Sequence, residues 1–237
     1  MDRSLYIFTS IKKEIWWYSV RKKIIKKIID RYLLKKRHLN ILDIGSGMGG
    51  LLEVLNDYGK VSIVETNKDC RNYLKDNFAY IKRIIPSISK IKGKFDLITI
   101  FDALEHIKDD KKTIKELKLF LNDGGIIMIT VPAFQFLWSS HDELSMHFRR
   151  YNKKSIKEVF RDYKEIKISF FNYFLFFPIL VTRKFFNLLN INVKQNELAN
   201  NFLFNFILKQ IFNIESLLIN KIDIPFGTSL YAIYEKK

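Results

Sequence analysis

The chain has 237 residues, of which 48% are hydrophobic and 28% are charged. This composition is typical of a folded globular protein and excludes an intrinsically disordered chain. The net charge of +16 would attract nucleic acid or an anionic membrane, but an AT-rich genome, with its abundance of Lys, Ile and Asn, explains it equally well.

Cysteine content and the N-terminus indicate the compartment. Cys70 is the only cysteine, which excludes an intrachain disulfide and a cysteine-cluster metal site and favours a reducing environment. Met1–Ser10 lacks the pattern of a secretory signal, and the longest apolar stretch, Ile168–Val181, is shorter than the ~20 residues that span a bilayer. We expect a cytoplasmic protein without a transmembrane anchor, with the inner face of the membrane as the alternative location.

Helical and strand patterns alternate along most of the chain. An N-terminal helix is expected over 14–37, apolar on one side and basic on the other. Further helices are expected at 51–58, 68–78, 111–121, 153–162 and 201–221, and strands at 40–44, 60–65, 95–101, 126–131, 165–171 and 227–234. We expect Asn122–Gly125 to end the helix before it. The alternation predicts a parallel sheet with helices on both faces.

A glycine-rich motif, Asp43-Ile-Gly-Ser-Gly-Met-Gly, comes directly after a strand and opens a helix. Glycines permit a tight turn and a close ligand approach, and the helix N-terminus offers free N–H groups. Glu65 ends the next strand, where a carboxylate can accept hydrogen bonds from both hydroxyls of a ribose. The alternative for Glu65 is a solvated acid at a strand end.

These motifs resemble those of the class I S-adenosylmethionine-dependent methyltransferases. The segment 41–50 resembles the first motif of that family, 95–107 its fourth strand and following turn, and 121–132 the segment leading into its fifth strand. The resemblance implies a doubly wound, seven-stranded, mostly parallel Rossmann-like sheet and S-adenosyl-L-methionine as cofactor. We expect an N-terminal helical cap at 1–38 and a methyltransferase domain at 39–237, with an aromatic-rich helical insertion at 172–222.

The resemblance also implies which residues bind the cofactor. Asp43, Gly45 and Gly47 would hold its methionine portion, and Glu65 its ribose. Ser87 and Ile88 would lie along the adenine, and Asp102 and Ala103 near the sulfonium. The full implied set is Asp43, Gly45, Ser46, Gly47, Gly49, Glu65, Thr66, Ser87, Ile88, Asp102 and Ala103. The segment before Ser87 lacks the acid that reads the adenine amino group in many relatives, which leaves backbone groups for that contact.

Two further segments, 14–21 and 138–151, are similar to a bacterial group found among genes for surface-glycan and lipid-linked sugar assembly, which also resembles quinone O-methyltransferases. This similarity implies methyl transfer to oxygen, or less favourably nitrogen, on a small-molecule, sugar or lipid-linked glycan acceptor. The candidate acceptor-binding residues are Trp17, Arg21, His106, Trp138, Arg149, Arg150 and Tyr151.

The segment 138–151 also holds the candidate catalytic groups. An acceptor hydroxyl needs a base as the new bond forms, and His or Asp suits that role near neutral pH. We favour His141, oriented by Asp142 or Glu143, with His147 as the substitute. The alternative is a structural lid whose charges pair with neighbouring arginines. We expect no metal, because the spacing of these residues matches no defined site.

The basic helix and the aromatic segment 168–221 admit several interpretations. They suit contact with an anionic membrane, or packing within the core or a homodimer. RNA methylation is the alternative activity, but the chain lacks the Asn/Asp-Pro-Pro-Tyr/Phe tetrad, which argues against a nucleic-acid partner. A non-catalytic scaffold that retains the fold is the remaining alternative.

Overall fold

The computed structural model describes residues 16–33, 38–188, 202–219 and 221–237, and for 16–18, 184–188 and 202–209 it describes the backbone alone. A seven-stranded sheet has the order β3-β2-β1-β4-β5-β7-β6. The neighbours from β3 to β5 pair in parallel, whereas β7 is antiparallel to both β5 and β6. The strands are β1 (Leu39–Ile44), β2 (Gly59–Val64), β3 (Arg83–Ile85), β4 (Phe95–Phe101), β5 (Leu121–Pro132), β6 (Tyr163–Phe171) and β7 (Ser229–Lys236). The predicted seven-stranded, mostly parallel sheet is confirmed.

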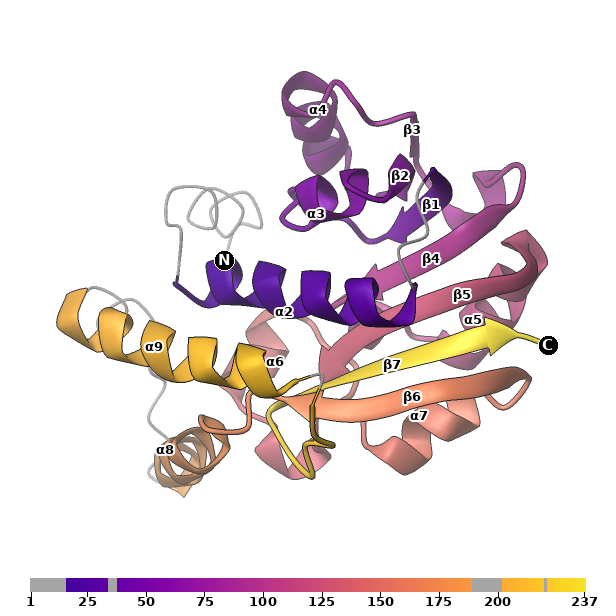
Figure 1. The fold of residues 1–237 in the computed structure, drawn as a ribbon. Coiled ribbons are helices and arrows are strands. Elements are labelled where there is room, and N and C mark those ends of the chain that lie inside the picture. The colour runs from indigo at the N-terminus through magenta and orange to yellow at the C-terminus, as the bar shows by residue number, and fades with distance from the viewer. Residues whose placement is uncertain (1–15, 34–37, 189–201, 220) are drawn as a thin grey trace.

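Helices flank the sheet on both faces, with α2 in front of the sheet and α5 and α7 behind it in Figure 1. The helices are α2 (Trp16–Tyr32), α3 (Leu52–Asn56), α4 (Lys68–Asn77), α5 (Asp110–Leu117), α6 (Ser140–Leu144), α7 (Lys153–Val159), α8 (Phe176–Leu188) and α9 (Phe202–Leu218). The described residues also form short 3-10 helices, namely η1 (Ile88–Lys90), η2 (Leu104–His106), η3 (Lys118–Phe120) and η4 (Gln135–Leu137). No helix in the described part of the chain is long and apolar enough to cross a membrane.

The N-terminal helix α2 belongs to the same hydrophobic core as the sheet. Val20, Ile24 and Ile28 recur every four residues, which places them on one helix face, and all three are fully buried. On a different face of α2, Lys27 Nζ donates a hydrogen bond to the backbone carbonyl of Ser216 at 2.7 Å. This bond links α2 to α9, which lies beside it in Figure 1. A cap that ends at residue 38 as a separate domain stays a prediction.

Asn122–Gly125 was expected to terminate a helix, and this expectation is wrong. The α-helix ends at Leu117, η3 follows, and Asn122–Gly125 lies inside β5. Leu121 pairs with Phe95 of β4, and a register shift follows between Phe95 and Leu97. A Cβ on Gly125 would lie 2.8 Å from the carbonyl oxygen of Asn122, so glycine permits the irregular start of the strand.

The insertion predicted at 172–222 contains α8 and α9, and residues 189–201 between them lie outside the described part of the chain. Glu215 of α9 accepts hydrogen bonds from the backbone N–H groups of Asn172 and, at 2.8 Å, Tyr173. The carboxyl ends of β4 and β5 point towards α6, α8 and α9 (Figure 1). Because parallel strands end together, the loops after β1, β2, β4 and β5 meet at this edge.

Candidate active site

The glycine loop after β1 combines close packing with open space. Gly45 has φ +74°, and a Cβ there would lie 2.6 Å from the Cβ of Ala103. Gly47 has φ +54°, and a Cβ there would meet no atom of the described residues within 4 Å. Glycine adopts these conformations without strain. The loop therefore packs against the turn after β4 and leaves room for a ligand beside Gly47.

Glu65 follows β2 and holds the glycine loop through its carboxylate. Its Oε2 accepts a hydrogen bond from the backbone N–H of Gly47 at 2.8 Å, and its Oε1 accepts one from the N–H of Asn67 at 2.7 Å. Each carboxylate oxygen has two lone pairs. Glu65 can therefore accept further hydrogen bonds from ligand hydroxyls while it holds the loop.

Asp43 is buried in β1, next to the glycine loop. Its Oδ1 accepts a hydrogen bond from Oγ1 of Thr99 at 2.6 Å. Burial raises the pKa of Asp43 to about 6; the hydrogen bonds from Ser46 and Thr99 oppose this shift, and the charge of Glu65 adds to it. A cationic ligand group next to Asp43 would stabilise its ionised form.

Asp102, directly after β4, is fixed by α2. It has φ +48°, which is uncommon for a residue other than glycine. Its carboxylate forms an ion pair with Arg21 and accepts a hydrogen bond from Oγ1 of Thr130 at 3.1 Å. Arg21 is 2% exposed and also donates to Oγ1 of Thr130 at 2.7 Å. The buried guanidinium thus links α2 to the carboxyl ends of β4 and β5.

Asp142 is the centre of the loop after β5. This fully buried residue accepts hydrogen bonds from the backbone N–H of Ser139 at 3.0 Å and from Nε and Nη2 of Arg150 at 2.8 and 3.0 Å. Nδ1 of His147 lies 2.9 Å from its Oδ1. Burial opposes ionisation, but the hydrogen bonds from His147 and Arg150 hold the pKa of Asp142 well below its usual range.

His147 is oriented by this contact. Because an ionised Asp142 accepts the Nδ1 proton, Nε2 is the ring nitrogen available to a ligand. The His147 ring lies edge-to-face with His106, with ring centroids 4.7 Å apart, and its centroid is 6.5 Å from that of His141. The Asp142–His147 pair can accept a proton or bind a cation through Nε2.

Glu105 lies in η2, two residues after Ala103. Its side chain is buried, and in the described part of the chain its Oε2 has no hydrogen-bond partner. Burial raises the pKa of Glu105 well above its usual value, and the charge of Asp102 adds to this shift. The carbonyl oxygen of Glu105 accepts a hydrogen bond from the N–H of Phe148 at 2.8 Å, which places η2 beside the segment that carries His147.

The sequence profile of the methyltransferase-domain family matches residues 16–164, which is more than half of the chain. The chain belongs to this family. A ubiquinone biosynthesis O-methyltransferase of Coxiella burnetii is 29% identical over 109 residues, which cover 43% of this chain and 46% of that protein. An N-methyltransferase 4 of Papaver somniferum is 28% identical over 115 residues, 44% of this chain and 32% of that protein. The chain thus matches less than half the length of these relatives.

Solved structures of methyltransferases share the fold. The plantazolicin methyltransferase BpumL, in complex with a desmethyl plantazolicin analogue and S-adenosylhomocysteine (SAH), aligns with a TM-score of 0.60 at 14% identity, over 100% of this chain and 92% of that one. Coclaurine N-methyltransferase, bound to N-methylheliamine and SAH, aligns with a TM-score of 0.56 at 14% identity, over 91% and 72% of the two chains. The predicted Rossmann-like methyltransferase fold is confirmed.

The residues at this edge of the sheet fit S-adenosylmethionine, the cofactor that the sequence motifs predict. The open space beside Gly47 admits a ligand against the backbone, and the buried carboxylate of Asp43 suits a cationic amino group. Glu65 keeps lone pairs for ribose hydroxyls. Asp102 and Ala103 lie at the adjoining strand end. The individual contacts stay predictions.

The remaining predicted cofactor residues lie around the same edge. Ser46 donates from its hydroxyl to the carbonyl of Asp43 at 3.4 Å, and Gly49 has φ +82° with a Cβ position blocked by Phe78. Thr66 is exposed next to Glu65. Ser87 and Ile88 are half-buried at η1, after β3. Their contact with adenine stays a prediction.

The expected orientation of His141 by Asp142 or Glu143 is wrong. Asp142 contacts His147, and Oε1 of Glu143 accepts a hydrogen bond from Nε1 of Trp138 at 3.3 Å. Burial lowers the pKa of His141, and the charge of Arg183 adds to this effect. The physical reason is that Asp142 forms the capping box of α6, which turns its side chain inward.

Several residues expected to bind the acceptor have partners within the protein. Besides Arg21, the buried Tyr151 donates from its hydroxyl to Oδ2 of Asp110 at 2.9 Å. Arg149 pairs with the same carboxylate at 2.7 Å. Arg150 is buried against Asp142. Buried charged and polar groups need internal partners, and Arg21, Arg150 and Tyr151 have them. The Arg149 side chain is 32% exposed, and the acceptor-binding roles of these residues stay predictions.

The other candidate acceptor-binding residues differ in their exposure. His106 is exposed beside His147, and Trp138 is half-buried at the end of η4. Trp17 lies in the first turn of α2, and its side chain lies outside the described part of the structure. The sequence analysis missed Glu105 and Arg183. The adjacency of Glu105 to His106 was the available signal, whereas nothing in the sequence placed Arg183 of α8 within 3.6 Å of Asp142.

Proposed function

We propose that this methyltransferase transfers a methyl group from S-adenosylmethionine to an oxygen atom of a sugar, a lipid-linked glycan or a comparable small acceptor. The Asp142–His147 pair at the carboxyl edge of the sheet is the observation that carries this proposal. The name of the Coxiella relative, a ubiquinone biosynthesis O-methyltransferase, agrees with an oxygen acceptor.

The chemistry requires positioning and one proton transfer. S-adenosylmethionine supplies a methyl carbon bonded to a positively charged sulfur, which is already a good leaving group. The acceptor oxygen must lie in line with that bond, and its proton must leave as the new bond forms. Asp142 fixes the His147 ring so that Nε2 activates the acceptor oxygen, and the Arg150 guanidinium holds Asp142 in place.

The donor site is tested by calorimetric titration of the protein with SAH. We expect micromolar binding, weakened by ~1–3 kcal/mol in Glu65→Ala because ligand hydroxyls lose their acceptor. Glu158→Ala, which removes an exposed acid on α7, is the matched control and should bind SAH as the wild type does. A folded protein that does not bind SAH would leave only the non-catalytic scaffold.

The acceptor side is tested by incubating the protein and isotopically labelled S-adenosylmethionine with sugar nucleotides, lipid-linked saccharides and quinone precursors. Carbon NMR of the product distinguishes an O-methyl from an N-methyl group. Transfer to an amine alone, or to RNA alone, would contradict the proposal.

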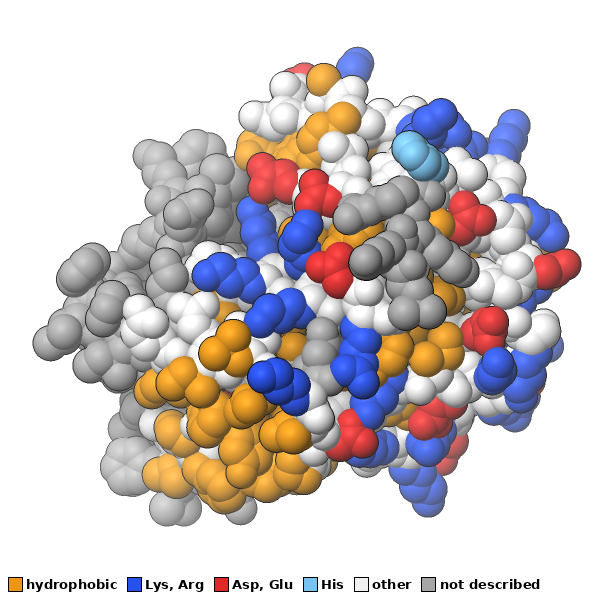
Figure 2. Space-filling model, in the orientation of Figure 1, with side chains coloured by type: hydrophobic (Ala, Val, Ile, Leu, Met, Phe, Trp, Pro, Cys, Tyr) orange, Lys and Arg blue, Asp and Glu red, His pale blue; other side chains and the backbone are white. Residues whose placement is uncertain are grey.

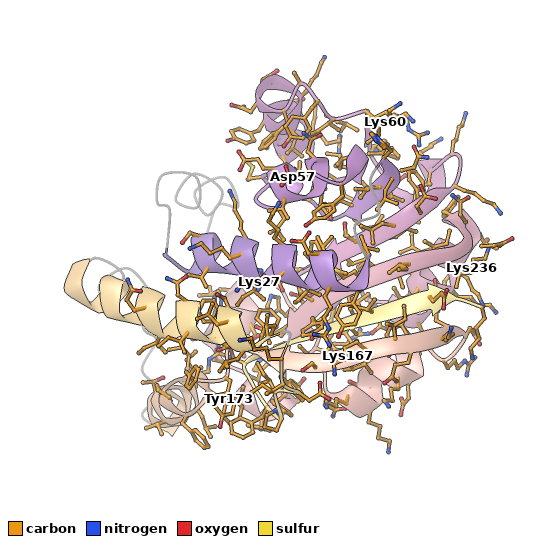
Figure 3. All side chains as sticks on the ribbon, in the orientation of Figure 1. Lys27, Asp57, Lys60, Lys167, Tyr173 and Lys236 are labelled. Atoms are coloured by element: carbon orange, nitrogen blue, oxygen red, sulfur yellow. The ribbon has the colours of Figure 1, made fainter. Side chains whose placement is uncertain are left out.

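The surface beside the site favours a lipid-linked acceptor. Figure 2 shows hydrophobic side chains gathered over the region of α8, next to Lys and Arg side chains. This apolar surface comprises Phe174, Phe177, Val181, Ile214 and Leu217, which are between 40% and 65% exposed. Lys27, Lys167 and Tyr173 lie on the face of the molecule that carries α2 and α9 (Figure 3). Exposed apolar groups next to basic groups suit an anionic membrane interface.

Helix α8 connects this surface to the site. Phe177 and Val181 are exposed on α8, while Arg183 of the same helix lies 3.6 Å from Asp142. An acceptor whose lipid portion stays in the membrane could thus present its polar head near His147. Part of the aromatic segment packs internally, since the rings of Phe134 and Phe170 stack with centroids 5.0 Å apart.

Sedimentation with vesicles tests the membrane contact. We expect the protein to pellet with phosphatidylglycerol-containing vesicles, and the variant Phe177→Ser/Val181→Ser to stay in the supernatant. Leu119→Ser is the control, because Leu119 is 70% exposed on η3, away from α8. Equal pelleting of all three proteins would contradict membrane contact through α8, and a dimer dissociated by the α8 substitutions would assign the surface to a second copy.

A further inference from the structure

Three potential metal ligands converge beside the donor loop. Glu105, His106 and His147 each offer a ligand atom, and these atoms all lie within 4.8 Å of one another. Glu105 and His106 are neighbours in η2, and His147 comes from the loop after α6. Donor atoms on one ion at about 2.1 Å from each ligand lie within about 4.2 Å of each other. A small side-chain adjustment would therefore bring all three onto one ion.

The unpaired oxygen of Glu105 is the second observation. Glu105 is 1% exposed, and its Oε2 has no hydrogen-bond partner among the described residues. A buried polar atom without a partner is rare in native proteins and is often explained by a bound ion or water. Here the unpaired oxygen belongs to the same residue that offers a ligand atom to the two imidazoles.

The orientation of His147 is the third observation. Histidine ligands in metal sites usually donate their other ring N–H to a carboxylate, which fixes the tautomer and the ring. Nδ1 of His147 contacts Asp142 at 2.9 Å, and Asp142 is itself held by Arg150. The lone pair on Nε2 is thereby directed away from Asp142, and His106 is the ring beside it.

We infer that Glu105, His106 and His147 bind a divalent cation that accepts imidazole and carboxylate ligands, such as Zn²⁺ or Mn²⁺. Three protein ligands leave coordination positions open, as in catalytic rather than structural sites. The inference rests on the proposed function and deepens it, because the open positions would take the acceptor oxygen. It replaces the expectation of no metal, which considered only the spacing within 138–151.

A cation at this place would supply the activation that the transfer needs. A hydroxyl bound to a divalent cation is more acidic than a free one. Its proton can therefore leave to water while the oxygen forms a bond to the methyl carbon and the sulfur keeps the electron pair of the broken bond. Ala103, which packs against Gly45 of the donor loop, is two residues from Glu105, so the cation would lie next to the donor site.

Metal binding is measured without any acceptor. The protein is dialysed against a chelator and titrated with Mn²⁺, followed by electron paramagnetic resonance, and with Zn²⁺, followed by calorimetry. We expect one equivalent of micromolar binding, weakened at least ~10-fold in Glu105→Gln and in His106→Ala. Asp142→Asn should weaken it by ~10–100-fold, because the partner of a ligand histidine has that effect. His141→Ala, whose ring is outside the cluster, should bind the metal normally.

The outcomes separate the two proposals. His106 is exposed, so its replacement by alanine should leave the fold intact and keeps the test valid if a buried variant does not fold. Absence of Mn²⁺ and Zn²⁺ binding, or equal binding by wild type, Glu105→Gln and His106→Ala, would overturn the metal site. If SAH still binds in that case, the donor site of the proposed function stands; loss of SAH binding would overturn the proposed function instead.

Discussion

Asp142 contacts Nδ1 of His147 at 2.9 Å, and it makes this contact from a fully buried position in which Arg150 and Ser139 also bind its carboxylate. Of the two histidines in the segment after β5, this contact orients only His147. His141, whose ring centroid lies 6.5 Å from that of His147, does not share this carboxylate as a hydrogen-bond acceptor. The relationship assigns acceptor activation to His147.

Replacing each histidine separately tests this assignment. We expect His147→Ala to lower kcat by ~10²-fold or more, because the group that activates the acceptor is lost. His141→Ala should lower kcat less than ~10-fold. Calorimetry with SAH should give wild-type donor affinity for both variants. A larger loss of kcat in His141→Ala would return the catalytic role to His141.

The two glycines of the donor loop should respond differently to alanine. A Cβ at Gly45 would lie 2.6 Å from Ala103, so Gly45→Ala should lower the free energy of unfolding by about 2–3 kcal/mol through the clash and the strained φ. The Cβ of Gly47→Ala would meet no atom within 4 Å in the parts of the chain that the structure describes, so this variant should lose about 1 kcal/mol from φ alone.

Gly47→Ala, which should change stability less, should have a large effect on SAH binding. A methyl group at Gly47 enters the space assigned to the ligand, so Gly47→Ala should weaken SAH binding at least tenfold while the protein stays folded. Urea denaturation and calorimetry measure the two quantities. Undiminished SAH affinity in Gly47→Ala would show that the ligand lies elsewhere.

The titration of Asp43 predicts how donor affinity depends on pH. Burial raises its pKa to about 6, so Asp43 is ionised above this pH and protonated below it. A cationic amino group of the ligand is stabilised by the ionised form. SAH affinity should therefore change little between about pH 7 and 8, where the ligand amine is still protonated, and fall up to about tenfold per unit as the pH drops below 6.

Asp43→Asn is the matched variant for this measurement. Asparagine keeps the shape and an acceptor for the Thr99 hydroxyl but carries no charge. Its SAH affinity should be lower than that of the wild type at pH 8 and should change little between pH 5 and pH 8. The same pH dependence in both proteins would assign the titration to another group.

The ion pair between Arg21 and Asp102 should contribute to stability. Arg21→Met removes a 3%-exposed guanidinium, while Asp102 keeps partial hydration because its side chain is 35% exposed. We expect the free energy of unfolding to fall by about 2–3 kcal/mol, somewhat less than for a fully buried pair. Lys22→Met, which breaks an exposed pair with Glu53, should change it by less than about 1 kcal/mol. Equal effects would show that the buried pair does not anchor α2.

The elements that the sequence predicted well are those whose pattern is local. The run over 95–101 was expected as a buried strand and forms β4 with the same bounds, because both of its faces are covered. β3 has three residues and α8 lies in an almost uniformly apolar segment, so neither has a periodic pattern that predicts it. The start of β5 was misassigned because a glycine pair ends helices and also permits irregular strands.

The sequence by itself determined the family, the sheet and the donor loop. Asp43, the glycines and Glu65 lie within one strand–loop–helix–strand unit, so their proximity follows from chain connectivity. Only the tertiary structure showed which polar side chains have buried internal partners and which lie where they can contact a ligand. Arg21, Arg150 and Tyr151 resemble ligand-binding residues in the sequence, yet burial requires each to have an internal partner. Glu105 and His147 meet only because separate strand ends converge at one edge of the sheet.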